Sequence, residues 1–156
     1  MARRHRSIKR EVIPDPKFQS MEITRFVNQV MRKGKKTVAQ KIIYTALNQI
    51  EEKTKENPLE VFENAIENVR PQLEVKSRRV GGATYQVPME LSTPRSRSLA
   101  MRWIIQFSKA KKGVPLANAL ANELVDAHNN TGSAIKKRDD THKMAQANRA
   151  FAHYRW

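Results

Sequence analysis

Apolar residues recur at intervals of three and four positions along most of the chain, which is the pattern of helices with one buried face. The first stripe begins at Ile23 and continues through Met31. Comparable stripes predict five more helices, over about 37–50, 58–69, 93–112, 115–128 and 134–147. Trp103 lies on the stripe of the fourth helix and is expected in the core. The pattern therefore predicts a mainly α fold of six helices.

Local signals give the expected ends of these helices. Ser20 precedes the first stripe as an N-cap, and Gly34 follows it as the residue after the last turn. A capping box is predicted for 37–40 at the start of the second helix. Asn57, which stands before a proline, is a strong start for the third helix. Ser133 is expected to cap the sixth.

Residues 72–89 carry the one pattern that is typical of β-structure. Val, Thr and Tyr flank Gly81 and Gly82, and a glycine pair supplies the positive φ angles that a two-residue hairpin turn needs. This turn sets the expected pairing of the two strands: Arg78 with Tyr85, Arg79 with Thr84, and Lys76 with Val87.

The two ends of the hairpin differ in character. Its apolar residues lie near the base, where they can pack on a core: Val75, Val87 and Met89. Its cations lie toward the tip, with no apolar pattern to bury them. Because two strands alone are marginal in water, the base needs an anchor. The sequence predicts a protruding basic arm, with an ordinary solvated hairpin as the alternative.

The net charge of the chain indicates what kind of partner to expect. The 156 residues include 30 Lys and Arg against 15 Asp and Glu, a formal net charge of +15. Because such an excess repels itself in a compact domain, we expect a polyanionic partner, either nucleic acid or an anionic membrane surface. No apolar run is long enough for a transmembrane span, and no cysteine is present for disulfides or metal ligation. A cytoplasmic setting is compatible with this composition.

The length predicts a single domain with two appendages. A basic N-terminal extension is expected at 1–19, a helical domain at 20–147 with the arm at about 72–89, and a tail at 148–156. The extension buries too little apolar surface to order itself, so it is either a solubilising tail or a segment that orders on phosphates. The aromatic and basic tail is expected either to stack on bases or to dock on the body.

Separate groups of cations are the candidate nucleic-acid contacts. The extension holds Arg3, Arg4, Arg6, Lys9 and Arg10, and the joint between the first two helices holds Arg32, Lys33, Lys35 and Lys36. The arm holds Lys76, Arg78 and Arg79, and the fourth helix holds Arg95, Arg97, Arg102, Lys109, Lys111 and Lys112. The sixth helix and the tail hold Lys136, Lys137, Arg138, Lys143, Arg149, Tyr154, Arg155 and Trp156. Acids gather instead at 51–67, which should point away from a polyanion.

The sequence predicts no catalytic, cofactor or metal site. The histidines lack metal-ligand spacing, and phosphate-binding glycine motifs and nucleophile motifs are absent from the sequence. Asp139 and Asp140 are adjacent, so their carboxylates point different ways on a helix. A nuclease that uses His128 or His142 is the enzymatic alternative, although the sequence names no partner for either.

A set of short motifs occurs in a specific order: Pro14–Phe18, Gly34–Lys36, Glu67–Pro71, Val75–Gly82, Thr84–Pro88, Leu99–Ile104, Leu120–Leu124 and Ala147–Trp156. Together they make the chain resemble the S-seven family of bacterial small-subunit ribosomal proteins over essentially its whole length. The resemblance implies a fold of six helices with a protruding β-ribbon, in agreement with the apolar pattern.

The resemblance also implies a function: binding the 3′ major domain of small-subunit ribosomal RNA and nucleating assembly of the head. It places the chain near the exit-site tRNA, the mRNA path and protein S-eleven. Cations of the extension, the joint and the fourth helix are then expected on ribosomal RNA, and C-terminal residues on nucleic acid or protein. The tRNA and mRNA side receives the arm, with Lys76, Arg78, Arg79, Gly81, Gly82 and Tyr85. The alternative is an architectural DNA-binding protein whose β-ribbon enters a groove.

Overall fold

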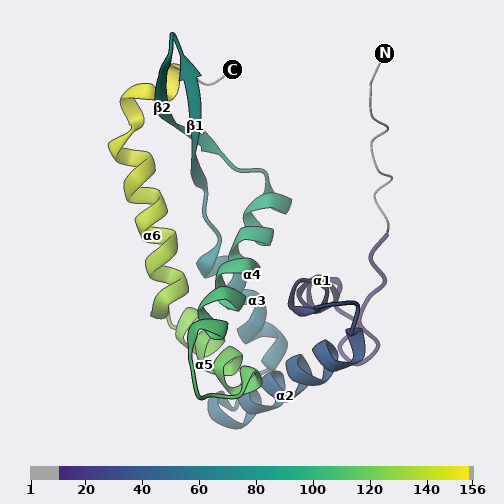
Figure 1. Ribbon diagram of the computed structural model, residues 1–156. Coiled ribbons are helices and arrows are strands. Elements are labelled where there is room, and N and C mark those ends of the chain that lie inside the picture. The colour runs from purple at the N-terminus through teal and green to yellow at the C-terminus, as the bar shows by residue number, and fades with distance from the viewer. Residues whose placement is uncertain (1–10, 155–156) are drawn as a thin grey trace, which may run out of the picture.

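The computed structural model describes residues 11–154, which form six α-helices, one two-stranded sheet and one 3-10 helix. Their order is α1 (Met21–Val30), α2 (Lys36–Thr54), α3 (Pro58–Val69), β1 (Leu73–Val80), β2 (Ala83–Glu90), α4 (Thr93–Ala110), α5 (Leu116–His128), α6 (Gly132–Ala147) and η1 (Arg149–Tyr154). The predicted mainly α fold with an inserted hairpin is confirmed. Figure 1 shows α1 to α5 gathered into a helical body, from which α6 and the hairpin extend side by side.

The apolar stripes meet in one core within the helical body. α3 contacts α2, α4, α5 and α6, and its residues Val61, Phe62 and Ala65 are fully buried. Phe62 packs edge-on against Phe26 of α1, with ring centroids 5.2 Å apart. Trp103 is 9% exposed and belongs to the same cluster, as predicted. Removal of this apolar surface from water is the main force that holds the helices together.

Local signals at the helix starts are confirmed in part. Asn57 caps α3 as predicted, because its side chain accepts a hydrogen bond of 3.0 Å from the backbone N–H of Leu59. Ser20 immediately precedes α1, but its side chain forms no capping hydrogen bond. Sequence signals therefore locate both starts, but only at Asn57 does the predicted capping hydrogen bond form.

The joint between α1 and α2 departs from the prediction. α1 ends at Val30, and Gly34 lies in the turn that follows, so the prediction of Gly34 as the residue after the helix is wrong. Lys33 and Gly34 have φ angles of 51° and 74°, which is how the chain reverses within a few residues. The capping box at 37–40 is also wrong, because α2 already begins at Lys36.

A buried carboxylate lies at the start of α6. The N-cap of this helix is Thr131, so the prediction of Ser133 as the cap is wrong. Glu123 of α5 is 1% exposed and accepts a hydrogen bond of 3.0 Å from the backbone N–H of Ala134. Its second oxygen lies 3.0 Å from Nζ of Lys111. The buried charge is thus both paired and hydrogen-bonded, and it ties the α4–α5 loop to α6.

The hairpin has the predicted register. β1 and β2 are antiparallel, and the pairs include Arg78 with Tyr85, Arg79 with Thr84, and Lys76 with Val87. The two turn glycines have φ angles of 57° and 87°, which residues with a Cβ rarely adopt. At the base, Val87 is fully buried, while Val75 and Met89 are half-buried.

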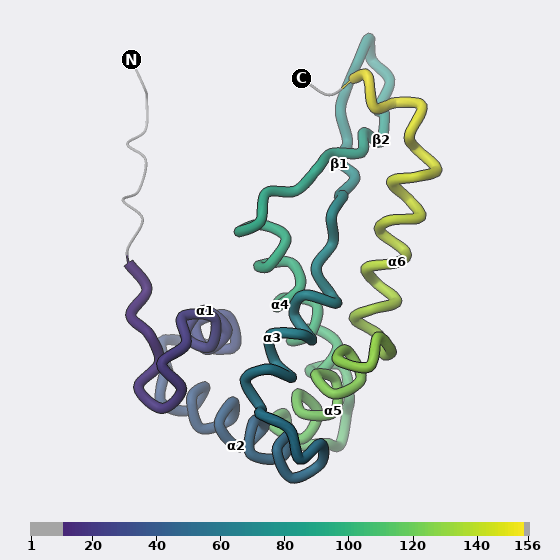
Figure 2. Tube along the Cα trace, turned by 180° about the vertical axis from the view of Figure 1, so that it is seen from behind, coloured from purple at the N-terminus to yellow at the C-terminus, as the bar shows by residue number. Residues whose placement is uncertain are grey.

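Two helical segments support the arm along its length (Figure 2). α6 packs along β1, and Nε2 of His142 accepts a hydrogen bond of 3.0 Å from the backbone N–H of Gln72. η1 packs on β2, where the ring of Tyr85 lies 5.3 Å from that of Phe151 and 5.1 Å from that of Tyr154. These contacts provide the anchor that an isolated pair of strands would lack.

Asp15 holds the segment that precedes α1. Its buried carboxylate accepts hydrogen bonds from the backbone N–H groups of Lys17 and Phe18, at 3.1 and 3.3 Å. The hydroxyl of Tyr44 on α2 donates a third, at 2.8 Å. Burial and this hydrogen bond raise the pKa of Tyr44 to about 12. This part of the predicted extension is therefore held on the helical body by the hydrogen bond from Tyr44 and by the packing of Phe18 against the core.

We expect Trp103→Ala to lower the free energy of unfolding by roughly 3 to 5 kcal/mol, as truncation of large aromatic residues in cores does. Urea unfolding followed by circular dichroism measures this loss. Met144→Ala is the matched control, because Met144 is an apolar helix residue that is 47% exposed. A change within about 0.5 kcal/mol, typical of surface substitutions, would show that Trp103 does not support the core.

Candidate nucleic-acid interface

Acidic residues neutralise some of the predicted cationic contacts. Glu74 on β1 accepts two hydrogen bonds from the guanidinium of Arg95 at the start of α4, at 2.9 and 2.8 Å. Nζ of Lys76 lies 3.1 Å from the same carboxylate. The hydrogen bond from Arg95 is the main cause that lowers the pKa of Glu74. Both cations are therefore engaged at the lower part of the arm, and Arg95 links the arm to α4.

Three other predicted contacts also have partners within the fold. Arg97 lies 3.0 Å from Glu22 of α1. Lys111 pairs with the buried carboxylate at the start of α6, and Arg138 lies 2.7 Å from Asp139. Because an ion-paired cation has to share or release its partner before it binds phosphate, these positions are weaker candidates for phosphate contacts.

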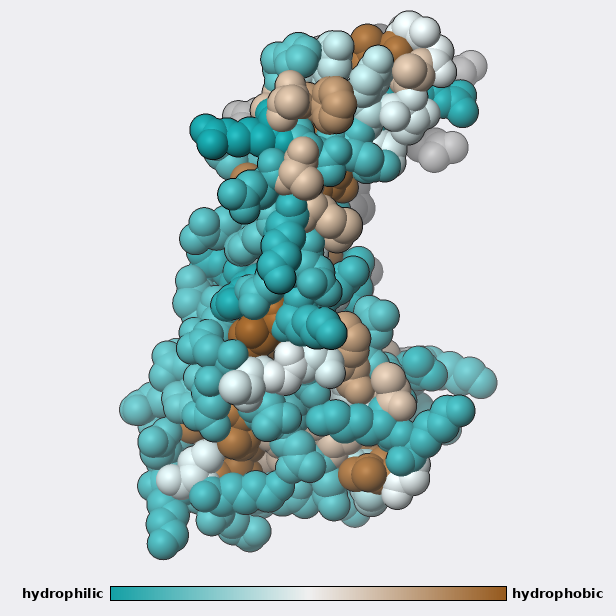
Figure 3. All heavy atoms as spheres, turned by 90° about the vertical axis from the view of Figure 1, so that its left-hand side faces the viewer, coloured by the Kyte–Doolittle hydropathy of each residue, from teal (hydrophilic) through white to brown (hydrophobic). Residues whose placement is uncertain are grey.

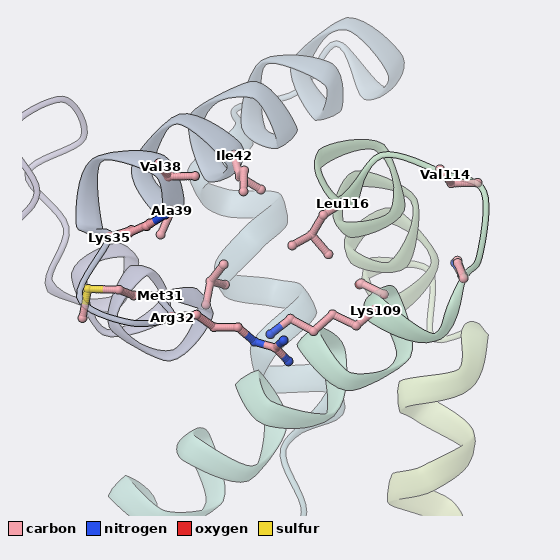
Figure 4. A pocket seen from close by; sticks show the side chains of 12 residues that line it. Met31, Arg32, Lys35, Val38, Ala39, Ile42, Lys109, Val114 and Leu116 are labelled. Atoms are coloured by element: carbon pink, nitrogen blue, oxygen red, sulfur yellow. The ribbon is translucent and has the colours of Figure 1, made fainter.

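Two groups of cations that are far apart in the sequence form one surface, the joint–α4 face. Arg32 and Lys35 from the joint and Arg102 and Lys109 from α4 line adjoining pockets on this face, and Lys33, Lys36 and Lys112 lie within three residues of them in the sequence. Figure 4 shows Arg32 and Lys109 extending toward each other. Burial, and secondly the charge of Arg32, lower the pKa of Lys109. Within residues 11–154, these exposed cations form no ion pair with a carboxylate.

Two adjoining pockets open on the joint–α4 face. One, of about 560 Å³, lies between α1 and α4. The other, of about 520 Å³, lies between the joint, α2, the end of α4 and the start of α5. Arg32 and Lys109 line both, and the residues that line the two pockets include no Asp or Glu. A hollowed surface with charge of one sign concentrates its field, which favours contacts with phosphate groups.

A group of acidic residues lies toward the C-terminal end of α2, whereas the cations of the joint lie at its N-terminal end. The acids at the C-terminal end of α2 and along α3 are exposed: Glu51, Glu52, Glu56, Glu60, Glu63 and Glu67. At the rise of an α-helix, Lys36 and Glu52 are roughly 24 Å apart along the axis. α2 thus presents cations at one end and acids at the other, an arrangement that orients the domain in the field of a polyanion.

At the tip of the arm, Arg79 and the two turn glycines are exposed, whereas Arg78 and Tyr85 are half-buried. The ring of Tyr85 contacts η1, so it serves to hold the arm as well as being a candidate contact. The sequence left open whether the tail docks or stacks on bases, and Phe151 docks on the arm.

The remaining predicted contacts lie on α6 and η1 or outside the residues that the structure describes. Lys136, Lys143 and Arg149 are exposed, and Lys137 and Tyr154 are half-buried. The structure describes 11–154, so seven predicted contacts lie outside it: Arg3, Arg4, Arg6, Lys9, Arg10, Arg155 and Trp156.

Other kinds of site receive no support from residues 11–154. None of the helices in that range is long and apolar enough to cross a membrane, and no group of three His, Asp or Glu there is arranged to hold a metal ion. Figure 3 shows hydrophilic residues over most of one side of the molecule, with apolar residues in small separate areas. His142 accepts a backbone hydrogen bond at the base of the arm, and His128 lies 3.6 Å from Glu56.

The sequence reasoning missed three acids that form ion pairs with predicted contact residues, namely Glu22, Glu74 and Glu123. Each pairs with a cation on another helix or strand or on the loop before α5, so the pairing has no periodic signature in the sequence. For Glu123 one signal exists, because it is the first acid after Glu90 in a stretch rich in cations. An isolated acid in such a stretch favours an internal ion pair.

Comparison with known proteins gives one family. The model for ribosomal protein S7p/S5e matches residues 2–149. Small ribosomal subunit protein uS7 of Thermotoga maritima is 60% identical over 154 residues, which covers 99% of both chains. The uS7 proteins of Myxococcus xanthus and of Anaeromyxobacter sp. strain Fw109-5 are 58% and 56% identical, and each alignment covers both chains completely.

We expect Arg102→Gln to reduce the slope of log K against log salt for RNA binding by about 0.7 to 0.9, the contribution of one phosphate contact. Filter-binding titrations at several salt concentrations measure this slope. Lys55→Gln is the matched control, since it removes the same charge among the exposed acids at the end of α2. Equal slopes for the two variants would contradict the assignment of Arg102 to a phosphate contact.

Proposed function

The chain belongs to the ribosomal protein S7p/S5e family, and we propose that it is a primary binding protein of the 3′ major domain of small-subunit ribosomal RNA and nucleates assembly of the head. Membership of the family makes it a structural constituent of the small ribosomal subunit and not an enzyme. Ribosomal RNA is accordingly among its partners.

The joint–α4 face is the observation that carries this proposal. Its cations are exposed and lack carboxylate partners within 11–154, whereas Arg95, Arg97 and Lys111 are ion-paired with carboxylates of the chain. Phosphate contacts made by such a face fix the position of a protein on its nucleic acid. Exposed cations on α6 and at the tip of the arm lie apart from it, which suits an irregular, folded RNA better than a uniform duplex.

The arm serves a different ligand in this proposal. α6 and η1 hold the hairpin away from the helical body (Figure 1), so its tip reaches beyond the surface that the joint–α4 face covers. Arg79 at the exposed tip can fork onto a phosphate or stack on a base, which lysine cannot reproduce. We assign the arm to the side of the exit-site tRNA and the mRNA path, with protein S-eleven among the neighbours.

We expect the triple variant Arg32→Gln, Lys35→Gln, Lys109→Gln to bind a 3′ major domain RNA fragment about a hundredfold more weakly, or weaker still. The reason is that hydrogen bonds to charged groups contribute about 1.5 to 3 kcal/mol each. The matched control replaces Lys41, Lys53 and Lys55 with glutamine. Competition with duplex DNA of equal length tests the DNA-binding alternative. Equal competition by DNA against the unaltered protein would overturn the proposal.

Replacing Arg79 through Thr84 with a Gly-Ser turn should leave folding and head assembly intact and reduce retention of tRNA in the exit site. The replacement keeps Tyr85, and with it the contact to Phe151 that supports the arm. Small subunits reconstituted with the shortened chain give both assembly yield and tRNA retention. Failed assembly by a normally folded variant would make the arm an anchor on ribosomal RNA.

A further inference from the structure

The pocket between the joint and the start of α5 combines an apolar wall with a basic rim. At about 520 Å³ it falls within the range of roughly 300 to 1,000 Å³ that is usual for sites of small organic groups. Figure 4 shows Ile42 on α2 and Leu116 on α5 extending toward the same space. The pocket is open to solvent on the joint–α4 face, so a group that belongs to a larger partner can enter it.

Part of the apolar wall of this pocket is exposed to solvent, unlike the apolar residues of the core. Val38 and Val114 line the pocket and are 53% and 43% exposed. Val30 and Ala39 also line the pocket and are buried. An apolar surface that stays in contact with water inside a hollow gains free energy when another apolar group covers it.

The rim of the pocket supplies cations from the joint between α1 and α2 and from the end of α4. Arg32 and Lys35 come from the joint, and Lys109 comes from the end of α4. The side chains of Arg32 and Lys109 extend toward each other (Figure 4), and burial together with the charge of Arg32 lowers the pKa of Lys109. An anion between them would relieve this repulsion, and the lining residues include no acid that already does so.

We propose that this pocket binds one unpaired nucleotide of the RNA, with its base against Val38, Ile42 and Leu116 and its phosphate between the cations of the rim. The inference rests on the proposed function, since it takes RNA as the partner. An extruded base has flat apolar faces joined to a charged backbone, which is the combination that the wall and rim accommodate. The planar guanidinium of Arg32 can cover the second face of the base by stacking.

The chain offers a direct way to identify the occupant, because it contains no cysteine. Val38→Cys introduces a single thiol at the wall, to which a short photoreactive group can be attached. Met144→Cys, at an apolar residue of similar exposure on α6, is the control. In a complex with the 3′ major domain fragment, we expect the probe at position 38 to crosslink to one unpaired nucleotide. Crosslinks spread over helical regions, or to a protein in assembled subunits, would overturn the proposal.

Affinity measurements separate this inference from the proposed function. The double variant Val38→Gln, Val114→Gln should bind the RNA about five- to tenfold more weakly, at the lower end of what stacking of one base contributes. Its salt slope should equal that of the unaltered protein, because no phosphate contact is removed. Met21→Gln with Met144→Gln is the matched control, since both methionines are exposed elsewhere.

A double-mutant cycle combines the valine double variant with removal of the base from the crosslinked nucleotide. An abasic site there should weaken binding of the unaltered protein and have little further effect on the valine double variant. Two results together would overturn the pocket inference and leave the proposed function standing. The valine double variant would bind the RNA as tightly as the unaltered protein, and RNA binding by the unaltered protein would still depend steeply on salt. If the unaltered protein does not prefer the ribosomal fragment over duplex DNA, the proposed function itself fails.

Discussion

Repulsion among positive charges is the constraint to which the rest of the structure responds. A formal charge of +15 on 156 residues disfavours the compact state, and few acids are available to offset it. Glu22, Glu74 and Glu123 are placed where one carboxylate both neutralises a cation and joins two parts of the chain. The cations of the joint–α4 face have no such partner in residues 11–154. Some cations are therefore ion-paired within the chain, and those of the joint–α4 face form a surface that an external polyanion would stabilise.

The elements that depend on neighbouring residues were predictable from the sequence. Apolar periodicity gave all six helices, and the assignment of Trp103 to the core followed from the same stripe. The register of the hairpin followed from Gly81 and Gly82, because a two-residue turn fixes every later pair of the strands. In each case the deciding interaction lies within a few residues along the chain, where spacing alone carries the information.

The elements that depend on distant residues were not predictable. Ser133 looked like a cap, yet the carboxylate of Glu123 takes the hydrogen bond near the start of α6. Among candidate contacts, the sequence could not distinguish Arg95, which is ion-paired with Glu74, from Arg102, which has no carboxylate partner within residues 11–154. The apolar pocket beside the joint was also invisible, because its walls come from the joint, α2, α4, α5 and the loop before α5. Tertiary proximity, rather than residue type, decides which cations are free.

The support of the arm by η1 has a consequence for the order in which the protein is made. A ribosome finishes the strands that end at Glu90 long before it adds Phe151, by about 3 to 12 seconds at usual elongation rates. During that interval the nascent hairpin lacks the aromatic contacts to Tyr85 and is a marginal pair of strands. Phe151 and Tyr154, which are added well after the strands, thus complete the support of the arm, so termination before Phe151 yields a body with an unsupported arm.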